Sequence, residues 1–563
     1  MSILASTSAQ KRTKFFRFDV WTLISLAILA IFLLFLVYPL WGVLKESVVD
    51  GEGQFTLSYF QQFFAKNYYF GTIINSVYLS VAVTVFCLLV GVPFSYFYTF
   101  YRLRGARALF VGAVLSVMSA PFIGAYAWIL LLGRNGIGTR AIEFLFPWGA
   151  GSVNIYGFAG VVFVLTLKMF PLVSVYMNGA FRSIDASLLE AAEQMGSTGI
   201  RRIWDVIVKL TIPTLLAASL LVFMRAFADF GTPLLIGEGF RTFTVEIYKQ
   251  YLGETGQNHN FAAAIGVIGV VVTAAIFLIQ KYAATKFSFS IKPGRIPEKR
   301  TPKGISGVLI YVYMYGLTAF AFLPQLYVVY LSFKNSTGSR FLPGFSLDSY
   351  KAAAGKLLGR SIWNTLSFGF ISLAIIIVLA VLIAYLVVRR SNVVNSSIDT
   401  LSMIPYIMPG AVLGIGLVIT FNQAPLALTG TAAIMIIALV VRRMPYTIRS
   451  ATATLMHIPM SMEEAARSLG ASKIKTFVKI TTPMMSAGIA SGAILSFVAI
   501  VTEMSAAIIL YNNRTITLTM SAYVAISRGS YGIATAFSAI LTVLTAVILL
   551  VYLRFTQEDN IKL

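Results

Sequence analysis

Two pairs of ionisable residues lie inside long apolar stretches of the sequence and recur at a constant offset. Asp229 corresponds to Glu503, and Lys168 corresponds to Arg442, each pair being 274 positions apart. Ionisable groups are costly within a bilayer, so residues of this kind are usually paired or functional. One interpretation is internal pairing, of Lys168 with Asp229 and of Arg442 with Glu503. In the alternative, the two carboxylates face each other and transiently attract a hard cation such as iron(III), which favours oxygen ligands.

The basic members of this set allow a different chemistry. Lys168, Arg442 and Arg443 could act as point charges for the oxygens of a phosphate or phosphonate group. Arg225 also lies in an apolar stretch, and neither it nor Arg443 has a charged counterpart in the other half. The residues alone do not decide between a cationic and an anionic ligand. No metal site is assigned, because Cys87 is the only cysteine and the two histidines form no ligand pattern with it.

A second motif repeats at the same offset in polar segments between apolar stretches. Each copy has a glutamate, two alanines and, four positions after the second alanine, a glycine: Glu190, Ala191, Ala192 and Gly196, then Glu464, Ala465, Ala466 and Gly470. Ser187 and Ser461 precede the glutamates by three, which is the spacing of a capping box. Alanines allow close approach of another surface, and glycine lets the chain leave a helix. The motif therefore predicts two short helices that dock another protein.

The composition shows which elements must position these residues. Of 563 residues, 58% are hydrophobic and 12% are charged, about half the charged fraction typical of soluble proteins. We therefore expect an all-α membrane protein with about twelve transmembrane helices in two parallel six-helix repeats, 1–290 and 291–563. The predicted spans are 20–44, 71–98, 107–133, 157–180, 211–236, 260–280, 305–333, 363–388, 398–421, 428–449, 483–510 and 531–553.

The net charge of +23 is mainly a topological signal. Most of the basic residues fall in segments that lie on one side of the membrane if the N-terminus is cytoplasmic, which satisfies the positive-inside rule. The first apolar segment is too long for a signal-peptide core, so we expect it to be retained. A basic, proline-containing linker over 282–304 joins the halves. Because the basic residues are dispersed between spans, contact with lipid headgroups is favoured over nucleic-acid binding.

The two Glu-Ala-Ala motifs, in loops of a parallel repeat, resemble the coupling helices of membrane subunits of ATP-binding-cassette (ABC) importers. The resemblance covers 70–555 and implies the type I permease fold. In that family a proline follows the glycine by about thirteen residues. Pro483 obeys this spacing, whereas Lys209 stands at the aligned place in the first half and Pro213 follows one turn later. We therefore expect the two halves to couple unequally.

The resemblance also implies a location and partners. The chain would be a multi-pass protein of the bacterial inner membrane, served by two ATPase subunits and an external substrate-binding protein. It would not itself be an enzyme and would bind no cofactor, since it contains no phosphate-binding GxxxxGK[ST] sequence. ATP and Mg would belong to the partner subunits.

The closest resemblance is to the fused-duplicate permeases of ferric-iron importers, through 228–233, 502–506 and the Arg-Thr-x-Thr pair at 241–244 and 514–517. Related permeases for phosphonates, sugar phosphates or thiamine are the alternatives. A twelve-span secondary transporter driven by protons through Asp229 and Glu503 is a further alternative, but it leaves the paired motifs unexplained. The spans contain no catalytic Ser/His, paired-Asp or HExxH pattern.

Overall fold

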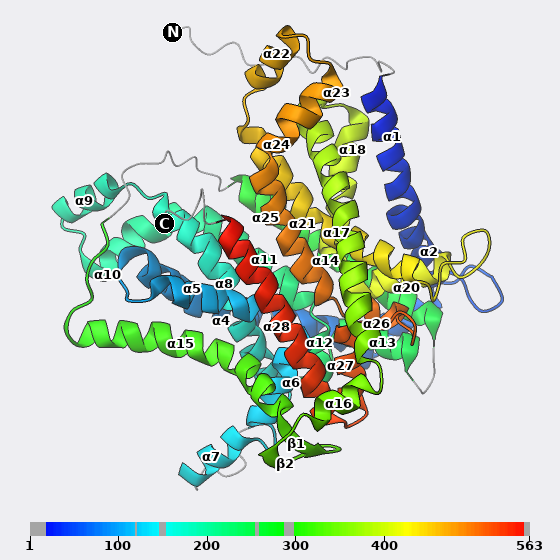
Figure 1. The fold of residues 1–563 in the computed structure, drawn as a ribbon, viewed down its shortest axis with the longest axis horizontal. Coiled ribbons are helices and arrows are strands. Elements are labelled where there is room, and N and C mark those ends of the chain that lie inside the picture. The colour runs from blue at the N-terminus through cyan, green and yellow to red at the C-terminus, as the bar shows by residue number, and fades with distance from the viewer. Residues whose placement is uncertain (1–18, 119–120, 146–153, 254–257, 287–297, 557–563) are drawn as a thin grey trace.

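The computed structural model describes residues 19–118, 121–145, 154–253, 258–286 and 298–556. These residues are almost entirely helical (Figure 1). Within the described ranges the strands form a single antiparallel hairpin, in which Thr337 of β1 pairs with Arg340 of β2. The predicted all-α architecture is therefore correct, with this hairpin as a small addition.

The described residues of the first half contain fourteen α-helices and two π-helical turns. In chain order they are α1 (Val20–Phe32), η1 (Leu33–Val37), α2 (Tyr38–Ser47), α3 (Ser58–Ala65), α4 (Asn67–Phe100), α5 (Ala106–Met118), α6 (Pro121–Leu132), α7 (Ile137–Leu145), α8 (Phe158–Arg182), α9 (Ala186–Gln194), α10 (Gly199–Arg202), η3 (Ile203–Val208), α11 (Lys209–Phe227), α12 (Gly231–Ile236), α13 (Phe243–Leu252) and α14 (His259–Lys286).

The second half repeats this pattern after the linker and adds the hairpin. Its elements are α15 (Gly304–Ser332), β1 (Lys334–Thr337), β2 (Arg340–Phe345), α16 (Asp348–Ala354), α17 (Leu358–Arg389), α18 (Val393–Leu401), α19 (Ile404–Ile407), α20 (Gly410–Thr420), α21 (Ala432–His457), α22 (Met460–Ser468), α23 (Lys473–Thr476), η4 (Phe477–Thr481), α24 (Thr482–Met484), α25 (Ser486–Val501), α26 (Ala507–Leu510), α27 (Leu518–Ser527) and α28 (Tyr531–Thr556).

The predicted spans are recovered, but several are not single straight helices. Among the described residues, eight helices are long and apolar enough to cross a membrane, and two bent pairs bring the number to ten. The predicted span at 107–133 appears as α5 and α6. The span at 428–449 is α21, which carries Arg442, Arg443 and Arg449. Each of the twelve predicted spans thus falls on one helix or on successive helices among the described residues.

The predicted span over 398–421 is broken, as Pro405 and Pro409 within it indicate. The chain bends by 112° between 393–407 and 410–420. A residue before proline is disfavoured in the helical region, and Met408 accordingly adopts ψ 132° before Pro409. A new helix, α20, starts at Gly410. The predicted span over 483–510 is also broken, since α24 and α25 meet at a bend of 68°.

The first helix of each half packs against the other half. α1 contacts α17 and α18, α2 contacts α20, and α15 contacts α5 and α6. At the start of α1, the Asp19 carboxylate accepts a hydrogen bond from Arg390 at 2.7 Å, and Trp21 stacks against Tyr385 with ring centroids 4.5 Å apart. The predicted boundary between 290 and 291 falls outside the described residues. The first helix of each sequence half therefore contacts helices of the other half.

Matching hydrogen bonds in the two halves hold corresponding helices together. The Asn75 side chain in α4 donates to the Arg241 carbonyl at 3.1 Å, and the Asn364 side chain in α17 donates to the Arg514 carbonyl at 2.8 Å. The two carbonyls belong to the repeated Arg-Thr-x-Thr segments. Each segment thus lies at the start of a helix: α13 starts within the first segment, at Phe243, and α27 starts directly after the second, at Leu518.

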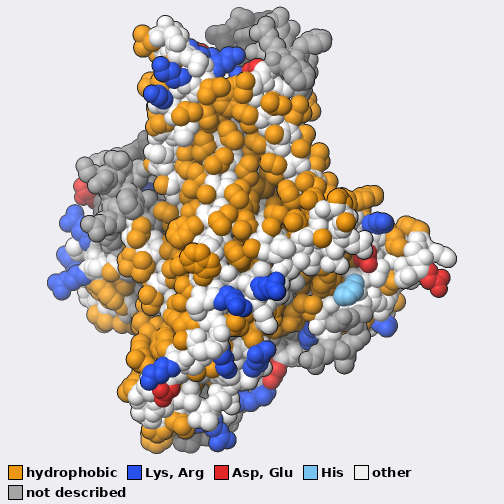
Figure 2. Space-filling view, turned by 45° about the vertical axis from the view of Figure 1, so that its right-hand side comes forward, with side chains coloured by type: hydrophobic (Ala, Val, Ile, Leu, Met, Phe, Trp, Pro, Cys, Tyr) orange, Lys and Arg blue, Asp and Glu red, His pale blue; other side chains and the backbone are white. Residues whose placement is uncertain are grey.

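The surface shows how the molecule meets lipid. In Figure 2 a broad field of hydrophobic side chains separates clusters of Lys and Arg at the top of the molecule from others lower down. Exposed apolar residues such as Leu89, Val378 and Leu550 are 57–64% exposed, which is costly in water but not in a bilayer. This pattern fits a protein embedded across its middle.

Candidate docking helices and membrane charge cluster

Both Glu-Ala-Ala motifs form short helices, α9 and α22, that end in the same way. In α9 the amide of Ser197 donates to the Ala192 carbonyl at 2.9 Å, and the amide of Gly196 donates to Glu193 at 3.0 Å. This is the Schellman pattern, which places glycine in a left-handed conformation. Gly196 has φ 81° and Gly470 has φ 87°, and the corresponding bonds recur after α22. The spacing from the second alanine to the glycine is therefore that of a Schellman motif, in which the alanine carbonyl accepts a closing bond and the glycine adopts the left-handed conformation.

The predicted capping boxes are absent from both helices. In α9 the N-cap is Asp185, whose carboxylate accepts from the amide of Ser187 at 3.0 Å, so the serine lies inside the first turn. In α22 the N-cap position is occupied by Pro459, with Ser461 inside the helix. The serine and glutamate have the spacing of a capping box, but the N-cap residue of each helix lies two positions before the serine. The two motif glutamates, Glu190 and Glu464, are exposed.

The two alanines of each motif face different ways. Ala192 and Ala466 are 4% and 6% exposed and pack inward, whereas Ala191 and Ala465 are exposed. The expectation that both alanines serve a docking surface is therefore wrong for the second of each pair. Neighbouring residues of a helix point in different directions, so only one alanine of each pair can lie on the face that meets a partner.

An apolar stripe on the exposed face of each helix was missed in the sequence. Leu188 and Met195 flank Ala191 and are 45% and 83% exposed. At the equivalent positions of α22, Met462 and Leu469 are 46% and 90% exposed. Residues seven apart lie on one helical face, so each stripe offers a continuous apolar ridge. The sequence did contain a sign of these stripes, because the apolar residues of one helix recur in the other at the same offset of 274 positions.

The two helices are anchored differently. Arg202 holds the partly exposed Glu193 of α9 at 2.7 Å. In α22 the nearly fully buried Glu463 pairs with Arg389, at the end of α17, at 2.8 Å. The position equivalent to Glu463 in the first half is Leu189. The second helix is thus tied to a membrane span by a buried ion pair, whereas the first is tied to α10.

The first membrane carboxylate is fully engaged by its own half. Asp229 is 9% exposed. One oxygen accepts from Lys168 Nζ of α8 at 3.1 Å, and the other accepts from the amide of Thr232 at 2.9 Å. The side chain therefore caps α12 and neutralises the lysine. This is the internal pairing predicted as one of the two alternatives.

The second carboxylate has the same cap and one more cation. Glu503 accepts from the amide of Ala506 at 3.1 Å, at the equivalent place before α26. Its other oxygen lies 3.0 Å from Arg442 Nε and also accepts from Arg443. The sequence had predicted Arg442 as its partner and did not foresee that Arg443 shares the same oxygen. Two guanidinium groups on α21 therefore converge on one carboxylate.

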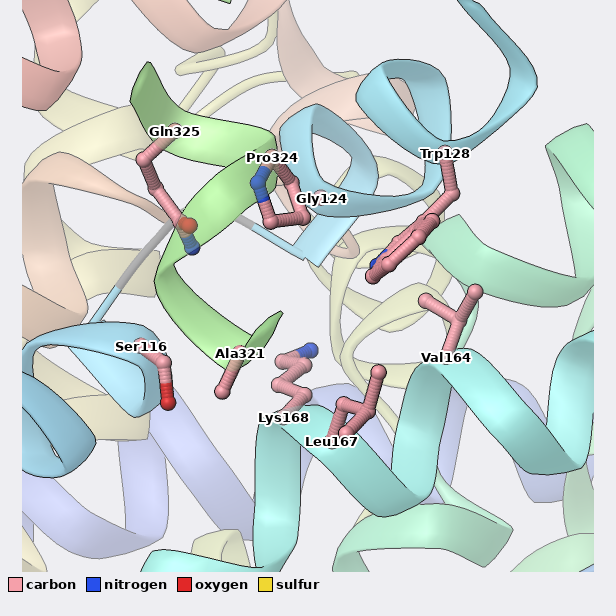
Figure 3. Close-up of a pocket in the computed structure, with 9 residues that line it drawn as sticks. All are labelled: Ser116, Gly124, Trp128, Val164, Leu167, Lys168, Ala321, Pro324 and Gln325. Carbon is pink, nitrogen blue, oxygen red and sulfur yellow. The ribbon is translucent and has the colours of Figure 1, made fainter. Parts of the chain in front are cut away.

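Lys168 points into a small cavity (Figure 3). Its cavity is about 20 Å³ and lies between α5, α6, α8 and α15, with Trp128 and Gln325 among its lining residues. A water molecule needs about 10–15 Å³, so this space has room for one water and no larger cargo. The cavity favours a structural role for the pair of Lys168 with Asp229.

Arg225 of α11 forms a polar contact across the two halves. Its guanidinium donates to the Tyr446 hydroxyl of α21 at 3.3 Å and lies over the same ring at 5.9 Å. Tyr406, just before the bend, packs against Tyr446 with ring centroids 5.8 Å apart. The described residues place no carboxylate in an ion pair with Arg225. Tyr446 was not singled out in the sequence, because it has no charged or repeated partner there.

No metal centre is apparent from these contacts. Across the described ranges no group of three or more His, Cys, Asp or Glu side chains could hold a metal ion. All four oxygens of Asp229 and Glu503 accept from groups of the protein. In this conformation the two carboxylates are therefore occupied, and the opposed-carboxylate hypothesis gains no support from the geometry.

Comparison with known proteins identifies the family. A family model described as a binding-protein-dependent transport system inner membrane component matches residues 141–288 and 376–557, more than half of the chain. The chain belongs to this family. Each matched segment contains one Glu-Ala-Ala motif, so the permease is a fused duplicate, and such permeases work with ATPase and binding-protein partners.

Individual relatives agree with this assignment. The permease is 28% identical over 95% of its length, and 78% of the other chain, to the ferric transport system permease protein FbpB of Actinobacillus pleuropneumoniae. It is 29% identical to the putative ferric transport system permease protein FbpB 1 of Haemophilus influenzae, over 86% of this chain and 77% of the relative.

Shorter proteins match one half of the permease. The putative 2-aminoethylphosphonate transport system permease protein PhnU of Salmonella paratyphi A is 26% identical over 48% of this chain and 93% of its own. Among solved structures, a bacterial ABC transporter involved in alginate import matches with a TM-score of 0.42 and 17% identity, covering 48% of this chain and 96% of that chain.

Proposed function

We propose that the permease is the membrane-spanning subunit of an ATP-driven importer that accepts iron(III) from an external binding protein. The observation that carries the proposal is the pair of docking helices, α9 and α22, which share their C-terminal glycine cap, their apolar stripe and their exposed glutamate. A secondary transporter has no use for two such helices. The relatives named for ferric transport, which match nearly the whole chain, favour iron as cargo.

The proposed partners divide the chemistry between them. Two ATPase subunits would each receive one docking helix and would bind the ATP and Mg, while this chain would bind no cofactor and catalyse no reaction. The protein would lie in the bacterial inner membrane with its N-terminus in the cytoplasm, because that orientation places most basic residues inside. The external binding protein would meet the loops on the opposite side.

The mechanism would be alternating access. Closure of the ATPases pushes α9 and α22, and the two halves rock about their pseudo-symmetry axis. The buried pair of Glu463 with Arg389 would transmit this push directly into α17. In the first half the force would pass through Arg202 and α10 instead. This difference in anchoring gives a physical reason to expect that the two halves couple unequally to the ATPases.

Among the other cargo classes, phosphonates have support in both the comparisons and the residues. A phosphonate is favoured by the relatives named for 2-aminoethylphosphonate transport, and the arginines of α21 suit its oxygens. Sugar phosphates and thiamine remain alternatives from the sequence resemblance. Proton-driven transport through Asp229 and Glu503 is disfavoured, because both carboxylates are held by cations and backbone amides.

Reconstitution tests the proposal. The permease, the ATPase and the binding protein, sought among adjacent genes, would be combined in proteoliposomes with ATP inside and ⁵⁵Fe(III)-loaded binding protein outside. We expect iron accumulation that requires hydrolysable ATP and survives collapse of the proton gradient. Uptake that persists without ATP and stops when the gradient is collapsed would overturn the importer assignment. ATP-dependent uptake of a phosphonate but not of iron would change only the cargo.

A further inference from the structure

Two guanidinium groups converge on one carboxylate inside the membrane, and a third contacts a tyrosine of the same helix. Arg442 and Arg443 share a single oxygen of Glu503, and Arg225 reaches the same helix, α21, through the Tyr446 hydroxyl. The cluster thus carries two more positive than negative charges. Such an excess is costly in a low-dielectric interior unless an anion joins it.

Some donors of this cluster have no partner. Arg442 Nη1 and Arg443 Nε are buried and make no hydrogen bond. Buried donors left unsatisfied are destabilising, and the planar fork of a guanidinium matches two oxygens of a phosphate or carboxylate. The unsatisfied atoms therefore point to an oxyanion rather than to a metal cation, which arginine cannot ligate.

The bend before α20 brings a helix start to the same place. A Cβ atom on Gly410, the first residue of α20, would lie only 2.0 Å from Arg442 Nη1, so glycine is needed for the guanidinium to approach. The start of this eleven-residue helix has no side-chain cap. Unpaired amides and the helix dipole favour an anion there.

We propose that Arg225, Arg442 and Arg443, with the start of α20, form an oxyanion-binding site on the transport pathway. The ligand class is a phosphate or phosphonate group, either free or bound to iron(III) as a complex of net negative charge. The inference rests on the proposed importer function and deepens its cargo. It places the contact between Arg225 of α11 and the arginines of α21, and it excludes Lys168, whose pair with Asp229 is neutral and whose cavity admits one water.

The site also spans the interface that must move. Arg225 belongs to the first half, whereas Arg442, Arg443 and Tyr446 belong to the second. Rocking of the halves would separate Arg225 from the other two arginines and remove one charge from the ligand. Binding in one conformation and release in the other follow from that separation.

A binding measurement tests the site without any partner protein. Inorganic phosphate and methylphosphonate would be titrated into the detergent-solubilised full-length permease, with ³¹P NMR line broadening as the readout. We expect broadening in the wild type and at least a tenfold weaker affinity in R225Q and R443Q. The matched control is R449Q, because Arg449 lies on the same helix and has its own partner in Asp399 at 2.8 Å.

Several results would overturn the site. These are absence of broadening in the wild type, equal affinity in R225Q and R443Q, or equal loss in R449Q. Melting temperatures report whether each variant is folded. If R443Q does not fold, R225Q decides alone, since it leaves the contacts of Glu503 with both arginines of α21 in place.

Transport in the reconstituted complex distinguishes the two sources of the oxyanion. Entry of ⁵⁵Fe and ³²P-phosphate together indicates an iron complex, and entry of phosphate or phosphonate without iron indicates a free anion. Iron uptake at the same rate in oxyanion-free buffer, unaffected by R225Q, would overturn the inference. If no ATP-driven uptake occurs while phosphate binding still depends on Arg225 and Arg443, the importer proposal fails and the binding site stands.

Discussion

The hydroxyl oxygens of Tyr248 and Tyr523 lie 3.4 Å apart, although the residues are 275 positions apart in the chain. They occupy equivalent positions in α13 and α27, so a direct contact between them must lie on the pseudo-symmetry axis that relates the halves. In Figure 1 both helices lie in the lower half of the view, whereas α22 lies at the top. The halves therefore touch, on their axis, far from this docking helix.

Tethering this pair should block transport. With Cys87, the only and buried cysteine, replaced by alanine, Y248C/Y523C joined by a short bis-maleimide linker should lose nearly all uptake, because the halves can no longer separate there. A disulfide-containing linker lets reductant restore activity. The single variants with the same reagent are the controls. Full uptake by the tethered protein would show that the tyrosines do not part during the cycle.

Charge reversal in the docking helices should uncouple the permease from its ATPases. E190K together with E464K should abolish uptake while the protein remains inserted, since both glutamates are exposed on the proposed contact face. D348K, on a different exposed helix, is the matched control. Uptake and retention of the ATPase on the tagged permease are measured. Normal transport by the double variant would remove the docking assignment.

The apolar stripes of α9 and α22 should contribute strongly to the affinity for the ATPase, although each consists of few side chains. M195A and L469A remove the most exposed apolar side chain of each helix, 83% and 90% exposed. Each change should leave permease stability within about 0.5 kcal/mol, as is usual for surface sites, yet weaken ATPase binding roughly tenfold. Equilibrium binding of the purified ATPase provides the check. A loss of stability equal to the loss of binding would contradict a docking role.

Removing Asp229 tests whether its pair with Lys168 is structural. D229N leaves a buried lysine without a counter-ion and should lower the free energy of unfolding by about 3–5 kcal/mol. Adding K168M removes the orphan charge and should recover most of that loss. Thermal unfolding and iron uptake are compared for both variants. A stable D229N that cannot transport would instead assign the carboxylate to the cargo.

Breaking the anchor of α22 should be more damaging than the matching change in α9. E463A leaves Arg389 buried and unpaired and should reduce uptake at least tenfold, while ATP hydrolysis persists. L189A, at the equivalent position of α9, removes no charge and should retain most uptake. The ratio of ATP hydrolysed to iron imported is measured for each. Equal ratios in the two variants would argue against unequal coupling.

The sequence predicted what repetition and hydrophobicity encode. The two repeats, most span positions and the two short helices follow from the constant offset and from long apolar runs. Pro405 and Pro409 indicate that the span over 398–421 is broken or kinked, but no local pattern predicts the size of the bend, 112°. The capping residues were missed, because Asp185 and Pro459 lie outside the motif that drew attention.

Other features depend on contacts that no local pattern contains. The pairing of Glu503 with Arg443 arises because two neighbouring arginines converge on one oxygen, whereas the repeat offset pointed only to Arg442. The exchange of α1 and α15 between halves could not be predicted either. A lipid-facing helix is apolar all round, so its composition does not indicate which helix it packs against.

The crossing of α1 to the second half sets an order of events during synthesis. Arg390, which holds Asp19, is made 371 residues later. At about 5–20 residues per second, the first span waits in the bilayer for roughly 20–70 s before its binding surface exists. During that interval α1 lacks its partners α17 and α18, although α2, in the same span, can already pack against α14. The earliest part of the chain to enter the membrane is therefore among the last to find its final place, and nascent chains halted before α17 should leave this span open to other helices.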